Sequence, residues 1–565
     1  MSDEAAELGR LSEAFFEAQN RADPLGATLL GIEGYDGLLP DLTREGARGD
    51  AARFAAIEAG RARLDPAALD ERGRTNLAVL ERLCWGARSD LEHGLWEANC
   101  SAEGYAAPTS MVFMCVPSAT VKDGASADAY LTRLAGLAGL FEAAGARFAE
   151  ASAEGRRSTA VGIRQALAQL EGHLAAPIAD DVLANPVVSG SADAERVRSA
   201  ARREVESSVR PAMARLCDML RDRLLPGARP DEEVGIAHVP GGEAGYRAAV
   251  RRHTTTTRSP EQIHAVGLER LEELSGEWSS LGRAVLGTGD VTEVLARLRD
   301  DPALRFQDAA QIVAVVRGAL ERAEAARDQW FPPYRIADCV IEEINPIEAG
   351  NAALAHYRPP ADDGSRPGAH CVLTTEPAER FTYEYEALAF HESSPGHHLQ
   401  IASAQTLRDL PRYRRFLDAQ VCAYVEGWGL YAERLADEMG LYTSDLARLG
   451  MLSFESLRAC RLVVDTGMHH LGWSRAKAAQ FMWEHTATTR ANVDNEITRY
   501  IGWPGQALAY LIGCREIRRL RRLAEQRLGA GFDVRAFHGT VLGSGAVPLE
   551  VLEQLVEAWI SASGG

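Results

Sequence analysis

Three histidines and one glutamate lie within eight residues in the segment Phe390-His-Glu-Ser-Ser-Pro-Gly-His-His-Leu-Gln400. The pair His391-Glu392 comes first, and His397 and His398 follow the Pro-Gly step. In the helical zinc-binding motif H-E-x-x-H, two histidines one turn apart bind the ion, and the glutamate between them is the general base. The same residue types in this segment predict a metal site on a helix.

The spacing differs from that motif, because the fourth residue after His391 is Pro395. In a regular helix His398 would lie about 10.5 Å further along the axis than His391, too far for both to bind one ion at about 2.0–2.1 Å. Pro395 has no backbone N–H to donate, and Gly396 tolerates unusual dihedral angles. We therefore predict a two-residue bulge that brings His397 to the second ligand position, with His398 beside the site or facing the substrate. The alternative is a helix end with exposed histidines.

A carboxylate on a later helix is expected to be the third ligand. Glu426 and Glu433 are seven residues apart in Val425-Glu-Gly-Trp-Gly-Leu-Tyr-Ala-Glu433, so they share one helix face. We prefer Glu426 as the ligand, because Gly427 beside it would let the backbone approach the metal. Glu433 then suits the second ring nitrogen of a ligand histidine. The reverse assignment stays open, as does an ordinary surface role for either glutamate.

Most of the remaining sequence has helical character, since Ala, Leu, Glu and Arg dominate and β-branched runs are rare. Only residues 331–376 are rich in Pro and in short β-type runs. We predict a mainly α protein with a helical region over 1–330, a small β insert with a loop over 331–376, and a helical metal-binding region over 377–565. Within the insert, residues 371–375 are a candidate edge strand for pairing with an extended substrate.

The composition narrows the functional class. The 565-residue chain has 46% hydrophobic and 25% charged residues, as globular proteins do. A formal net charge of −19 disfavours binding to nucleic acid, which needs a basic surface. The nine scattered cysteines contain no C-x-x-C pair, so we expect reduced thiols in a cytoplasmic protein. The N-terminus does not resemble a secretory signal. The sequence contains no run of about 18 apolar residues, so we do not expect a membrane partner.

Asp465, His469 and Tyr385 are further candidates for contact with a substrate. Asp465 and His469 follow Arg461 at intervals of four, so Arg461, Asp465 and His469 stack on one helix face. They form either a buried salt-bridged network or a line that orients His469 toward the substrate. Tyr385, two turns before His391, either reaches the cleft or packs in the core.

Two candidates lie in a later segment. Tyr500 is our candidate hydrogen-bond donor to the oxyanion of a tetrahedral intermediate. Arg499 could bind a substrate carboxylate through two parallel hydrogen bonds. The alternative for Arg499 is an ion pair with Glu496 on the surface of a helix.

Four motifs together resemble the bacterial DUF885 family: HESSPGHHLQ from His391, EGWGLYAERLADEMGLY from Glu426, RLVVDTGMHHLGWS from Arg461 and RYIGWPGQALAYLIG from Arg499. The resemblance covers nearly the whole chain. It implies a zincin-type metallopeptidase of mainly helical architecture, similar in outline to thermostable carboxypeptidases, thimet-type oligopeptidases and angiotensin-converting enzyme. Those enzymes enclose a deep channel between helical lobes and cut short peptides.

We therefore expect a zinc-dependent hydrolase of peptide or related amide bonds in short substrates, of carboxypeptidase, dipeptidase or oligopeptidase type. Glu392 is the expected general base, and Zn²⁺ is the expected cofactor. One alternative is an amidase that acts on a single peptide-like biosynthetic intermediate. Another is a catalytically silent helical scaffold that keeps the metal site. The substrate, the cleavage position and the oligomeric state stay open.

Overall fold

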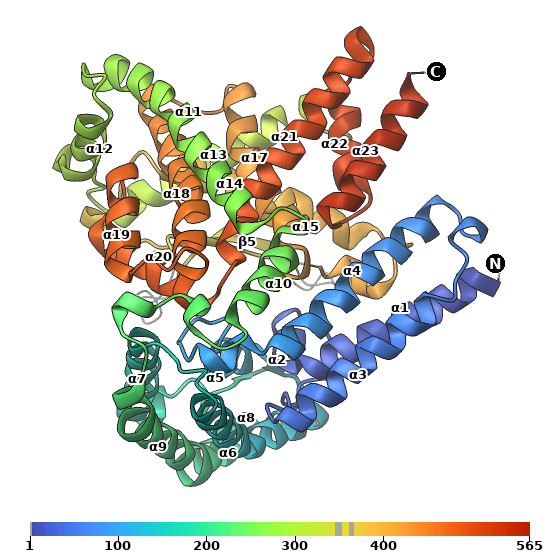
Figure 1. Ribbon diagram of the computed structural model, residues 1–565, viewed down its shortest axis with the longest axis vertical. Coiled ribbons are helices and arrows are strands. Elements are labelled where there is room, and N and C mark those ends of the chain that lie inside the picture. Colours follow the sequence, from blue (N-terminus) through green and yellow to red (C-terminus); the bar gives the residue numbers. More distant parts are fainter. Residues whose placement is uncertain (1–2, 345–352, 361–365, 418, 565) are drawn as a thin grey trace. The chain divides into compact units, whose positions relative to one another are not determined.

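The computed structural model describes residues 3–344, 353–360, 366–417 and 419–564 (Figure 1). The described chain is mainly helical with small sheets, so the predicted mainly α class is confirmed. It divides into two compact units. The first unit covers Met1–Ala249, Gly467–Ala478 and Asn495–Pro504, and the second covers Val250–Thr466, Ala479–Asp494 and Gly505–Gly565. The region boundaries that the sequence predicts at residues 330 and 376 stay a prediction. The deep channel between helical lobes, implied by the resemblance to zincins, also stays a prediction.

The first unit is built around a long helix, α6 (Gly124–Ala153), which starts with a capping box between Asp123 and Ser126. Apolar side chains of α6, among them Leu134, Leu137 and Phe141, lie in a hydrophobic core of this unit. The other helices that begin in its first segment, Met1–Ala249, are α1 (Asp3–Ala22), α2 (Pro24–Leu29), α3 (Arg44–Arg61), α4 (Glu71–His93), α5 (Pro108–Cys115), α7 (Ala160–Ala175), α8 (Ala194–Glu204), α9 (Arg210–Met219) and α10 (Gly242–Thr254). Two short strands, β1 (Thr120–Val121) and β2 (Val187–Val188), pair in parallel.

The second unit contains the predicted metal-binding segments. Its helices include α13 (Ala309–Trp330), α14 (Tyr385–Glu392), α15 (His397–Thr406), α17 (Cys422–Glu438) and α21 (Ala509–Leu528). The remaining helices from residue 260 onward are α11 (Pro260–Leu286), α12 (Val291–Asp300), α16 (Arg412–Arg415), α18 (Asp445–His469), α19 (Arg475–His485), α20 (Arg490–Gly502), α22 (Val534–Gly543) and α23 (Leu549–Ser563). The last residues of α18, the first of α19 and most of α20 belong to the first unit.

A three-stranded sheet occupies the predicted insert. Its order is β3-β5-β4, with β3 (Cys339–Glu343) parallel and β4 (Ala355–Arg358) antiparallel to β5 (Gly368–Val372). The expectation that residues 371–375 form an edge strand is wrong for the residues that lie in β5. Cys371 and Val372 pair with both neighbouring strands, so their backbone has no free side for an extended substrate.

Helix α14 is held by an apolar core that reaches helices on two sides. Phe390 and Ala389 pack with Ile312 and Val316 of α13 and with Ala436 of α17. In Figure 1, α13, α14 and α17 lie together in the second unit. This packing sets the axis of α14 and therefore the position of the two residues at its end, His391 and Glu392.

Tyr385, at the start of α14, belongs to the same core. Its hydroxyl donates to the carbonyl of Leu373 at 3.3 Å, and its ring packs edge-on against Phe306. The core-packing alternative therefore describes Tyr385, and the predicted reach into a cleft is not seen. Within the described residues, no helix has both the length and the apolar composition needed to cross a membrane. All nine cysteines are free thiols.

Candidate metal centre

Three side chains from three helices meet in the second unit. His391 is the last residue but one of α14, His397 begins α15 and Glu426 lies in α17. Glu426 Oε2 is 3.5 Å from Nε2 of His391 and 3.5 Å from Nε2 of His397, and one ligand atom from each residue lies within 4.8 Å of the others. Both histidines are buried. The sequence predicted these same three residues as the ligand set.

The chain reaches this geometry through a break between two helices, which differs from the predicted bulge in one helix. Helix α14 ends at Glu392, and α15 begins only at His397. Pro395 in the break cannot donate a helical hydrogen bond. A Cβ atom at Gly396 would lie 1.9 Å from the carbonyl oxygen of His391, so only glycine fits. The break turns the chain, and His397 thereby comes beside His391 although five residues lie between them.

Trp428 of α17 holds the segment between α14 and α15 in place through its indole. Its Nε1–H donates to the carbonyl of Pro395 at 2.9 Å, and the side chain is fully buried. Because Trp428 lies two residues after Glu426, one short stretch of α17 supplies a candidate ligand and also fastens the loop that carries the histidines.

Glu433 holds the other side of the His391 ring. Its Oε1 lies 2.8 Å from Nδ1 of His391, and Arg458 lies 3.7 Å from the same oxygen. This contact matches the role that the sequence predicted for Glu433. In a neutral imidazole, the ring nitrogen that contacts a carboxylate carries the proton. Nδ1 of His391 therefore carries the proton in the neutral ring, and Nε2 is the nitrogen that faces Glu426.

The electrostatics of the cluster follow from these contacts. Burial by itself lowers the pKa of His391, but hydrogen bonds with Glu426 and Glu433 outweigh burial and raise this pKa to about 9. Burial raises the pKa of Glu426, whereas the hydrogen bonds with His391 and His397 bring that pKa well below its ordinary value. The metal-free cluster therefore favours an ionised carboxylate between two nitrogen donors.

Two glycines of α17 have roles that differ from the sequence prediction. Gly427 faces α21, where an added Cβ would lie 2.5 Å from the backbone of Gly513. It therefore permits close helix packing and gives no approach to the metal site. Gly429, which the sequence reasoning missed, faces the ring of His391. Its position three residues after Glu426 and four before Glu433, on one helix face, is the signal that could have identified it.

His398 lies beside the cluster and not in it. Its Nδ1 contacts the hydroxyl of Tyr357 in β4 at 3.0 Å, and burial lowers its pKa to about 4. A Cβ at Gly368 would lie 2.9 Å from both of these atoms. The sheet thus fixes His398 through a tyrosine, and His397 is the second histidine of the cluster.

Glu392 is the last residue of α14 and is partly buried. Its charge contributes to the raised pKa of His391 and to the raised pKa of Cys371 in β5, where the larger cause is burial. The role of Glu392 as general base stays a prediction.

Arg461 and Asp465 have partners within the second unit. Asp465 is fully buried and accepts hydrogen bonds from the backbone N–H of Gly505 at 3.2 Å, and the guanidinium of Arg461 lies over the ring of Tyr510 at 4.4 Å. These four residues belong to the second unit, whereas His469 belongs to the first.

The ring of His469 is occupied by backbone groups on both sides. Nδ1 accepts from the N–H of Ile236 at 3.1 Å, and Nε2 donates to the carbonyl of Tyr500 at 2.9 Å. Burial lowers the pKa of His469 to about 4. His469 therefore holds two backbone segments of the first unit together, in place of the predicted contact with substrate.

Tyr500 and Arg499 also belong to the first unit. The buried hydroxyl of Tyr500 donates to Glu496, and Nη1 of Arg499 lies 3.5 Å from Oε1 of the same glutamate. The Glu496–Arg499 pair that the sequence allowed as an alternative is therefore present. The predicted roles of Tyr500 at an oxyanion and of Arg499 at a carboxylate stay predictions.

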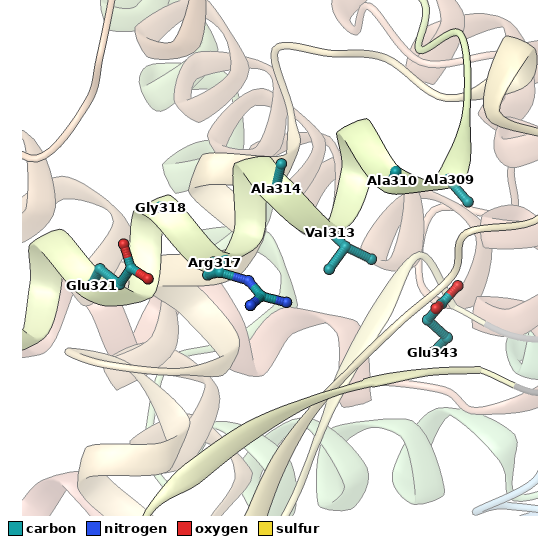
Figure 2. A pocket seen from close by; sticks show the side chains of 8 residues that line it. All are labelled: Ala309, Ala310, Val313, Ala314, Arg317, Gly318, Glu321 and Glu343. Carbon is teal, nitrogen blue, oxygen red and sulfur yellow. The ribbon is translucent and has the colours of Figure 1, made fainter.

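A pocket of about 650 Å³ lies elsewhere in the second unit, along one side of α13. Figure 2 shows Val313, Arg317 and Glu321 projecting from α13, with Glu343 of β3 nearby. Small residues form the rest of its wall: Ala309, Ala310, Ala314 and Gly318. None of the predicted site residues lines this pocket.

A mainly helical protein with a cluster of two buried histidines and one half-buried glutamate is the class that this fold and this site define. The chain belongs to the family described as bacterial protein of unknown function, DUF885, whose model matches residues 24–556. The match confirms the family that the four motifs predicted. The metallopeptidase activity implied by the resemblance stays a prediction.

Two solved structures are similar to the chain over almost its whole length. A candidate lipoprotein from Colwellia psychrerythraea has a TM-score of 0.91 and 26% sequence identity, with 100% of both chains covered. A candidate lipoprotein of unknown function from Shewanella oneidensis has a TM-score of 0.72 and 17% identity, over 97% of this chain and 99% of that chain. The second similarity shows a shared fold alone. No curated protein matches the chain.

Proposed function

We propose that this protein is a zinc-dependent hydrolase of peptide or related amide bonds in short substrates. The observation that carries the proposal is the cluster of His391, His397 and Glu426, supported by Glu433 on the second nitrogen of His391. Two histidines and one carboxylate are the ligand set of one group of catalytic zinc sites, which keep a fourth position open for water or substrate.

The geometry fits a zinc ion. Ligand atoms that lie about 2.0–2.2 Å from a tetrahedral ion are about 3.3–3.6 Å from one another. The two distances of 3.5 Å from Glu426 Oε2 agree with this range. In the described residues, the second carboxylate oxygen of Glu433 is buried without a hydrogen-bond partner, as is Nδ1 of His397. A bound cation would stabilise the carboxylates of Glu426 and Glu433 and offset the cost of burying their charge.

A bound zinc ion supplies Lewis acidity, which lowers the pKa of water and polarises a carbonyl. Glu392, next to His391 in sequence, would accept the proton of the attacking water and pass it to the leaving amine nitrogen. His391, His397 and Glu426 would hold the ion, and Glu433 would keep the ring of His391 in the ligating orientation. Water is added across the amide bond, and the products are a carboxylic acid and an amine.

We further propose short substrates with a free C-terminus, because Arg499 can bind a carboxylate bidentately. Arg499→Ala is expected to raise KM for free-acid peptides and to leave C-terminally amidated peptides nearly unchanged. Equal effects on both substrates would assign Arg499 to its ion pair with Glu496 and leave oligopeptidase or amidase action equally open.

The experiment that tests the function combines metal analysis with a panel of dipeptides and short oligopeptides. About one zinc per chain and zinc-dependent cleavage would support the proposal. Zinc without cleavage of any peptide would favour the amidase for a single intermediate or the silent scaffold. No zinc in a metal-replete preparation would refute the proposed function.

A further inference from the structure

The ring of His391 lies directly against the backbone of Gly429 in α17. A Cβ atom added at Gly429 would lie 2.6 Å from Cε1, 2.7 Å from Nε2 and 3.0 Å from Nδ1 of this ring. Non-bonded carbon atoms at optimal separation are about 3.5–4.0 Å apart. Any side chain at position 429 would therefore displace the imidazole, including the nitrogen that faces Glu426.

The ring has little room to move away. Glu433 holds Nδ1 at 2.8 Å, and the ring of His397 packs edge-on at a centroid distance of 4.7 Å. His391 is only 2% exposed, so protein surrounds it on the other sides. A displaced ring would have to lose its contact with Glu433 or press against His397.

Glu426, Gly429 and Glu433 follow one another along α17 at intervals of three and four, so they face the same direction. The two carboxylates contact opposite nitrogens of one imidazole, and the glycine lies against the ring between them. This arrangement requires the axis of α17 to run unusually close to His391. A residue with a side chain at the middle position would push the helix and the ring apart.

We infer that Gly429 is a positioning residue of the metal centre, which admits the His391 imidazole between Glu426 and Glu433 in the orientation that binds the ion. The inference rests on the proposed zinc site and adds a residue without any ligating atom. Metal ligands must lie within about 0.2 Å of ideal distances, so a shift forced by one methyl group is large enough to weaken binding.

The test compares Zn²⁺ affinity of the metal-free full-length chain and of Gly429→Ala, by titration against a competing chelator. We expect the dissociation constant of the variant to rise about 10- to 100-fold, the loss that altered support of a ligand typically causes. Gly276→Ala is the matched control, because Gly276 lies in helix α11 of the same unit and an added Cβ there meets no described atom within 4 Å. Its zinc affinity should equal that of the wild type.

The outcomes separate the inference from the proposed function. Wild-type chain that binds no zinc would refute both. Wild-type chain that binds zinc, together with a Gly429→Ala variant of unchanged affinity, would overturn only the positioning role. A loss of affinity that Gly276→Ala shares would also overturn it.

A second variant decides the question if Gly429→Ala does not fold. In the double variant His391→Ala/Gly429→Ala the imidazole is absent, so the added methyl group has space. We expect its thermal unfolding midpoint to return to that of His391→Ala alone. A double variant that stays unfolded would show that Gly429 is needed for another reason, and the inference would be wrong.

Discussion

Glu433 Oε1 lies 2.8 Å from Nδ1 of His391, and both side chains are almost completely buried. The contact is made from the side of the ring opposite to Glu426, whose Oε2 lies 3.5 Å from Nε2. One imidazole is therefore held between two carboxylates of the same helix. This relationship orients a ligand before any ion binds, which is the function of outer partners in metal sites.

Replacing Glu433 with glutamine should weaken zinc binding about 10- to 100-fold, because an amide is a poorer acceptor and no longer stabilises the ligating tautomer of His391. The dissociation constant, measured by chelator competition, checks this expectation. Glu438→Gln is the control, since Glu438 lies on the same helix in an ion pair with Arg521. Equal affinities of the two variants would contradict the role of Glu433.

His397→Ala should lose much more metal than His398→Ala, because Nε2 of His397 lies 3.5 Å from Glu426, whereas His398 contacts Tyr357. The zinc content of the purified variants, measured by elemental analysis, distinguishes the two histidines. Thermal unfolding of each variant in a chelator controls for lost packing. The reverse order of metal loss would exchange their roles.

Glu392→Gln should keep its zinc and lose about 10²–10⁴-fold in kcat on a cleaved substrate, because an amide cannot accept a proton from water. Zinc content and single-substrate kinetics on the same preparation are the measurements. Glu379→Gln, an exposed position before α14, is the control for surface charge. Near-native activity of Glu392→Gln would remove Glu392 from the mechanism.

Glu384, which precedes α14, predicts a pH dependence of stability. Burial raises its pKa to about 7, although a hydrogen bond from Ser453 at 3.1 Å and the charges of Arg458 and Arg305 lower it. The folded chain therefore holds the proton more tightly than the unfolded chain, whose pKa is near 4.5. The stability contributed by this proton is present below pH 4.5 and is lost as the pH rises through about 7.

Glu384→Gln removes this titration while keeping the shape of the side chain. At pH 8.5 the variant should be more stable than the wild type by about 1–3 kcal/mol, with a smaller difference at pH 5. Urea unfolding at the two pH values gives the measurement. A difference that does not change with pH would show that Glu384 is not the group responsible.

Local sequence patterns were sufficient for the candidate ligands and the fold class. The histidines, the Pro395-Gly396 interruption and the carboxylates seven residues apart follow from residue types and helical geometry, which nearby residues determine. The small sheet within 331–376 was predictable for the same reason, since Pro-rich and β-branched runs disfavour helix. The helical break itself was misjudged, because the path of the chain after Pro395 depends on the hydrogen bond from Trp428.

Tertiary packing decided the features for which sequence spacing allowed several outcomes. Gly427 and Gly429 are both helical glycines in one motif, yet only the neighbours of α17 place the first against Gly513 and the second against His391. Whether residues 371–372 form an edge or a central strand depends on pairing with β3 and β4, which come from elsewhere in the chain. His469 became structural because the backbone of Ile236 and of Tyr500 occupies both ring nitrogens. The sequence by itself determined which residues could bind a metal, whereas long-range contacts determined which of their neighbours hold them in place.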